Sequence, residues 1–81
     1  MAAKDPMLLQ LGKYLRQARE KRGWSQEELA YKCGLHRTYI GSVERGEYNI
    51  SLLSLRKIAD ALGISLPEAL AAAVAPRRRK K

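Results

Sequence analysis

Three polar side chains near the middle of the chain, Arg37, Thr38 and Ser42, have types and a spacing suited to contact with nucleic acid bases. An arginine can bond both O6 and N7 of guanine, and a threonine methyl group can pack on the methyl group of thymine. Arg37 and Thr38 would stand at the start of a helix, and Ser42 would follow one turn later on the same face. We expect these three residues to contact base edges in the DNA major groove; a solvated surface charge is the alternative for Arg37.

A second group of residues is suited to binding DNA phosphates. Gln26 would be the first residue of a helix, where free N–H groups and the helix dipole favour an anion and an amide can add a hydrogen bond. Its alternative is a plain N-terminal helix residue. Tyr39 and Asn49 are expected to hold the other side of the same phosphate track. His36 could reach a base or a phosphate, or simply begin a helix.

No combination of residues supports catalysis or metal binding. The chain has one histidine, His36, and one cysteine, Cys33. A single cysteine permits neither an internal disulfide nor a multi-cysteine metal site, and no nucleophile and base are paired in the sequence. We expect no enzymatic activity, no cofactor and no metal, and we expect Cys33 in the core.

Residues 26–44 have the pattern of two short helices joined by a tight turn. Apolar side chains fall where each helix needs an inner face, and Gly34 tolerates a positive φ between them. Ser25 and Glu28 have the spacing of a capping box, which starts the first helix at Gln26. The second helix is expected over 37–45. This is a helix-turn-helix pattern.

Three further helices are predicted from capping residues and apolar periodicity. The first begins at Pro6 with Asp5 as its N-cap, and the last runs from a second capping box at Ser65 to about residue 74. Between them, 52–62 forms a helix. Its expected inner stripe consists of Leu52, Leu55, Ile58, Ala59 and Leu62. With no strand signal, the fold class is all-α with five helices, the second and third forming the helix-turn-helix.

The charge balance favours a polyanionic partner. Sixteen Lys and Arg against eight Asp and Glu give a net charge of +8 over 81 residues, and five positive charges lie in residues 77–81. We expect one domain over 5–74 and a disordered basic tail over 75–81, which could add phosphate contacts or serve only for solubility. No stretch is apolar enough for a membrane span, so we expect a cytoplasmic protein that binds double-stranded DNA and no membrane.

From Leu15 to Leu70 the chain resembles the phage repressor and Cro type of helix-turn-helix domain, also called the xenobiotic response element family. The segments that carry this resemblance, in order and at the family's usual spacing, are 25–30, 34–35, 39–46 and 55–63. Within the family, the chain is similar to the controller proteins of restriction-modification systems at 36–40, 43–46 and 49–51. The resemblance implies a lambda-repressor-like fold that binds DNA.

The resemblance also implies structural roles for residues outside the DNA contact. The family usually pairs an arginine of the first helix with the glutamate ending the third, and Arg19 and Glu44 occupy these positions. The family commonly forms dimers near its C-terminus, where Leu53, Leu66 and Leu70 are more apolar than a core requires. The alternative is that the last helix only completes the core.

These observations together predict a dimeric, sequence-specific transcriptional regulator acting on palindromic operator DNA, either a repressor or a restriction-modification controller. The alternative is a protein-interaction module of the same fold, of the antitoxin or coactivator type. No small-molecule effector is expected, because the chain has no room for a separate ligand domain.

Overall fold

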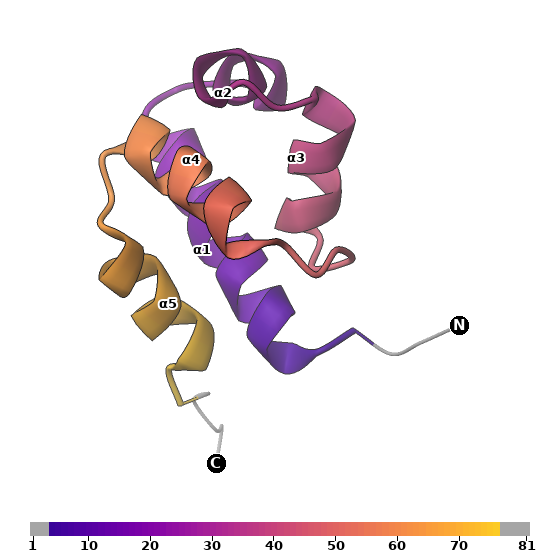
Figure 1. The fold of residues 1–81 in the computed structure, drawn as a ribbon, viewed down its shortest axis with the longest axis vertical. Coiled ribbons are helices and arrows are strands. Elements are labelled where there is room, and N and C mark those ends of the chain that lie inside the picture. The colour runs from indigo at the N-terminus through magenta and orange to yellow at the C-terminus, as the bar shows by residue number, and fades with distance from the viewer. Residues whose placement is uncertain (1–3, 77–81) are drawn as a thin grey trace.

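Five α-helices account for most of residues 4–76, the part of the chain that the computed structural model describes (Figure 1). Their bounds are Pro6–Lys21 (α1), Gln26–Cys33 (α2), Arg37–Glu44 (α3), Leu52–Leu62 (α4) and Leu66–Val74 (α5). The all-α prediction is confirmed. The third helix ends one residue earlier than expected, because Arg45 is its C-cap. Residues 77–81 of the predicted tail lie outside the described residues.

The helices begin where the capping residues predict. The side chain of Asp5 accepts a hydrogen bond from the backbone N–H two residues on, at 2.8 Å. Ser25 and Glu28 form a reciprocal capping box, with N···O distances of 3.0 and 2.7 Å. Ser65 and Glu68 form the second one. These bonds satisfy backbone donors that a helix start would otherwise leave unpaired.

α2 and α3 meet at a tight turn over residues 34–36 (Figure 1). Gly34 has a φ of +72°, a conformation that side-chain-bearing residues rarely adopt. The chain changes direction there, and the Leu35 N–H donates to the carbonyl of Ala30 at 3.0 Å. The turn therefore sets how α3 leaves α2.

The core draws side chains from all five helices. Its fully buried large members are Leu15, Leu29, Ile40, Ile58 and Leu62. Cys33 is buried among them, as expected. The predicted inner stripe of α4 is wrong at Leu52, which is 59% exposed. Leu52 is the first residue of α4. It has the apolar spacing of the inner stripe but lies beyond the part of α4 that the other helices cover.

α1 crosses α3 at Gly12 with no space for a side chain. A Cβ at this position would lie 2.5 Å from the carbonyl oxygens of Val43 and Glu44. Both atoms belong to the backbone and cannot rotate away. The close approach brings α1 against the C-terminal end of the helix that carries the predicted base contacts.

No helix within residues 4–76 combines the length and the apolar character that crossing a bilayer requires.

Gly12→Ala should destabilise the protein, although alanine is the better helix former by about 1 kcal/mol. Overpacking against the backbone should raise the cost to about 1–3 kcal/mol, measured as the change in the free energy of unfolding in urea. The matched control is Gly41→Ala in α3, where the new Cβ would lie 3.1 and 3.3 Å from side-chain atoms of Arg45 and Gln26 and would meet no backbone atom as closely as at Gly12. Equal stability changes for the two variants would contradict the close-approach argument.

Candidate nucleic-acid interface

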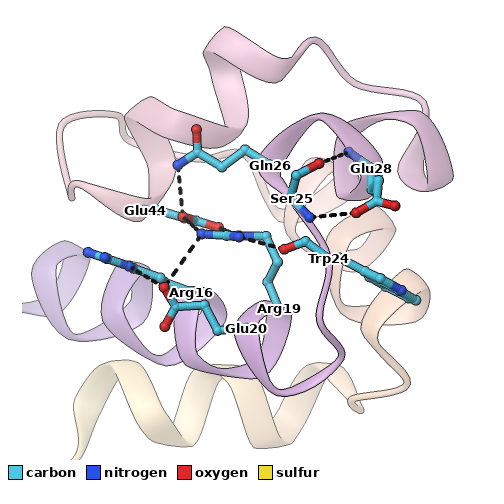
Figure 2. Close-up of polar contacts among 8 residues, drawn as sticks. All are labelled: Arg16, Arg19, Glu20, Trp24, Ser25, Gln26, Glu28 and Glu44. Carbon is cyan, nitrogen blue, oxygen red and sulfur yellow. Dashed lines mark hydrogen bonds and ion pairs between the residues drawn. The ribbon is translucent and has the colours of Figure 1, made fainter.

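A buried ion pair joins Arg19 of α1 to Glu44, the last residue of α3, the helix that carries the predicted base contacts (Figure 2). The guanidinium makes two hydrogen bonds to the carboxylate, with Nε···Oε2 at 2.7 Å and Nη2···Oε1 at 3.0 Å. Each residue is only 8% exposed. These are the two residues that the family resemblance paired, and the bidentate geometry is the strong form of this interaction.

The ion pair also holds the chain between α1 and α2. Arg19 Nη1 donates to the carbonyl oxygen of Trp24 at 2.7 Å (Figure 2). The hydrogen bond to Glu44 is the main reason that the pKa of Arg19 is raised above its usual value. The guanidinium therefore stays charged across the accessible pH range. The indole of Trp24 lies beside two other cations, with Lys32 at 4.7 Å and Arg22 at 5.5 Å from its ring.

Gln26, predicted to hold a DNA phosphate, is itself bonded to the ion pair. Its amide Nε2 donates to Glu44 Oε1 at 3.0 Å (Figure 2). An amide nitrogen carries two hydrogens, so one donor is engaged and one is left for a phosphate. The bond fixes the direction of the amide and ties the start of α2 to the end of α3.

His36 is the N-cap of α3. Its Nδ1 accepts a hydrogen bond from the Thr38 backbone N–H at 3.1 Å, so this nitrogen carries no proton. The structure thus gives His36 the helix-starting role that the sequence left open. Nε2 then carries the ring proton and can donate to a DNA oxygen.

Arg37 and Thr38 lie in the exposed first turn of α3. Arg37 Nη1 is 3.8 Å from Glu27 Oε2 of α2, and both side chains are well exposed. Such a pair contributes only about 0–1 kcal/mol. The guanidinium can therefore leave Glu27 for a stronger partner at little cost.

Arg45 is a polar residue of this surface that the sequence argument did not select. Its Nη2 lies 3.5 Å from the hydroxyl oxygen of half-buried Ser42, one of the predicted base contacts. Positions 37, 41 and 45 form one stripe at intervals of four residues. This spacing could have identified Arg45.

Tyr39 connects α3 to the segment that follows it. Its ring makes an edge-on contact with the ring of Tyr48, with centroids 4.8 Å apart and planes at 75°. Aromatic pairs prefer this geometry. The contact holds residues 46–51 beside α3, where Asn49 is exposed.

The three residues predicted at a dimer interface differ in exposure. Leu53 is 63% exposed and Leu70 is 42% exposed, whereas Leu66 packs partly buried against the core. Leu52 and Val74, at 59% and 67%, add exposed apolar surface on the same two helices, α4 and α5.

Two helices joined by a tight turn, with an exposed polar start to the second, define a helix-turn-helix domain of the kind found in DNA-binding transcriptional regulators. Residues 15–68 match the Helix-turn-helix family, and the chain belongs to this family.

Among its relatives, a hypothetical transcription factor from Neisseria meningitidis is 46% identical over 67 residues, covering 83% of this chain and 60% of that protein. This chain thus spans less than two thirds of the length of the Neisseria relative. The control protein C.BamHI from Bacillus amyloliquefaciens is 51% identical over 57 residues, covering 69% of this chain and 70% of that protein.

Solved structures show similarity to regulators of the same kind. The restriction-modification controller protein C.AhdI from Aeromonas hydrophila superposes with a TM-score of 0.74 at 47% identity, covering 76% of this chain and 94% of that chain. SinR, a master regulator for biofilm formation, has been solved in complex with DNA. It superposes with a TM-score of 0.70 at 34% identity, covering 74% of this chain and 97% of that chain.

Replacing one partner of the buried pair, by Arg19→Met or Glu44→Gln, should lower the free energy of unfolding by about 3–5 kcal/mol, because the remaining charge is buried without its partner. The measurement is urea unfolding followed by circular dichroism. The control is the exposed pair of Arg16 and Glu20, at 3.1 Å, where Arg16→Met should cost about 0–1 kcal/mol. Similar losses of unfolding free energy at both sites would show that the buried Arg19–Glu44 pair is no more important for stability than the exposed pair.

Proposed function

We propose that the chain is a sequence-specific transcriptional regulator that reads DNA in the major groove with α3. The observation that carries this proposal is the exposed first turn of α3, a helix whose last residue, Glu44, is held by bonds from Arg19 and Gln26. A recognition helix must present polar side chains outward while its own orientation is fixed. The solved complex of the related SinR with DNA supports the choice of ligand.

The proposed base contacts are Arg37, Thr38 and Ser42. Arg37 would exchange its weak contact with Glu27 for the O6 and N7 atoms of a guanine. Thr38 is exposed beside it, with its backbone N–H already used by His36. The exposed side chain of Thr38 can therefore face a base.

The proposed phosphate contacts flank α3. Gln26 has one amide hydrogen left, and it opens a helix whose free N–H groups favour an anion. Tyr39 and Asn49 lie on the opposite side, where the Tyr39–Tyr48 contact holds the connection against α3. His36 would donate from Nε2.

We further propose that the regulator acts as a homodimer on palindromic DNA. The exposed apolar side chains of α4 and α5 offer a self-complementary surface, and a two-fold dimer would place two α3 helices about one DNA turn, roughly 34 Å, apart. Similarity to C.BamHI and C.AhdI favours a controller of a restriction-modification system.

Selection of bound duplexes from a random pool tests the DNA-reading proposal. The protein should enrich a palindromic sequence, and Arg37→Ala should lose about 1–3 kcal/mol of discrimination at one base pair of each half-site. Thr38→Ala should relax a neighbouring position. The control is Arg56→Ala, which removes the same charge from an exposed position of α4. Failure to enrich any sequence would refute the proposal and favour a protein-interaction module.

Leu53→Glu should dissociate the proposed dimer, because a carboxylate would be desolvated at an apolar interface. Analytical ultracentrifugation at a series of protein concentrations measures the change. Tyr31→Glu is the matched control, since Tyr31 is 89% exposed on α2, which carries none of the proposed interface residues. A wild-type protein that remains monomeric, both alone and on its selected DNA, would exclude the dimer.

A further inference from the structure

Arg45, at the C-cap of α3, is held back along the helix by two contacts. Its Nε donates to Glu47 Oε1 at 3.0 Å, and its Nη2 lies 3.5 Å from the Ser42 hydroxyl oxygen. Its Nη1 would be 3.1 Å from a Cβ at Gly41, and Gln26 Oε1 would be 3.3 Å from the same point. The guanidinium therefore lies over Gly41, on the side of α3 that faces the start of α2.

Glu47 holds a second cation. Its Oε2 is 3.5 Å from Nζ of Lys4, which precedes α1. One carboxylate thus contacts two positive side chains at the edge of the proposed DNA-binding surface. Hydrogen bonding from Arg45, together with the charges of Arg45 and Lys4, holds the pKa of Glu47 below its usual value. Glu47 is therefore fully ionised at neutral pH.

These contacts are weak enough for DNA to displace. The side chains of Lys4, Arg45 and Glu47 are 45%, 55% and 40% exposed, and ion pairs this exposed contribute little to stability. A phosphate offers the same charge-assisted hydrogen bond as a carboxylate. Each phosphate that a cation neutralises also releases counterions from DNA. Glu47 and the DNA backbone are thus direct competitors for Arg45 and Lys4.

We propose that Glu47 lowers the affinity of the protein for non-specific DNA by occupying Arg45 and Lys4, and that Arg45 becomes a phosphate contact when α3 is seated in an operator. This inference rests on the proposed DNA-reading function. Non-specific binding comes almost entirely from phosphate contacts, so withholding two cations weakens it. In the operator complex, Arg37 and Thr38 contact bases and position α3 in the major groove. The Arg45 guanidinium then leaves Glu47 and contacts a DNA phosphate.

The test compares wild type, Glu47→Gln and Arg45→Gln by fluorescence anisotropy on the selected operator and on an unrelated duplex of equal length, over a range of salt concentrations. Glu47→Gln should bind the unrelated duplex roughly fivefold more tightly at low salt, with a plot of log K against log salt steeper by about 1–2, since each added phosphate contact contributes about 0.9. Operator affinity should rise by a similar or larger factor, because Arg45 must leave Glu47 in that complex as well, whereas the salt slope on the operator should change less, since Arg45 already contacts a phosphate there. Arg45→Gln should flatten the salt dependence on the operator by about 0.9.

Asp60→Asn is the matched control, because it removes one exposed carboxylate from α4. The inference is overturned if Glu47→Gln and Asp60→Asn act alike on the unrelated duplex, or if Glu47→Gln leaves operator affinity unchanged. In either case a wild type that still prefers its operator leaves the proposed function standing. A wild type with no preference between the duplexes overturns the proposed function, and this inference with it. Urea unfolding of each variant checks that the fold is kept.

Discussion

The arrangement of this domain depends on one buried carboxylate. Glu44 receives two hydrogen bonds from Arg19 and one from Gln26, while Arg19 also bonds the carbonyl of Trp24. α1, the turn after it, the start of α2 and the end of α3 thus meet at one set of bonds (Figure 2). Burying two charges is costly unless the bonds around them are nearly complete. A displaced α3 would break them, so the network favours a single orientation of this helix.

The fold was predictable where its signals are local. The Asp5 cap, the two capping boxes and Gly34 act within a few residues, and the structure has the helices that they predict. Leu52 was misjudged because periodicity assigns a face to a residue but says nothing of where the neighbouring helices end. The near-contact at Gly12 was likewise invisible, since it depends on backbone atoms some thirty residues later in the chain.

In the candidate site, too, local features were predictable from the sequence and long-range contacts were not. Exposure of Arg37 and Thr38 follows from their place in the first turn of α3 and was predictable. The bond from Gln26 to Glu44 spans 18 residues, and the Lys4–Glu47 contact joins the start of the chain to the segment after α3. Such pairs exist only once α1 and α3 have packed together. The outward-facing residues could therefore be predicted from the sequence more readily than the hydrogen bonds and ion pairs that orient them.

The crossing at Gly12 limits how α3 can adapt to DNA. With two carbonyl oxygens 2.5 Å from where a Cβ would stand, α3 has little freedom to tilt or slide against α1. In the proposed dimer, two such helices could fit a duplex only through movement at the dimer interface or through bending or twisting of the DNA. The energy of that deformation depends on base sequence even where no side chain reaches. A close helix contact inside the protein would in this way select for the mechanical properties of base pairs at the centre of the operator.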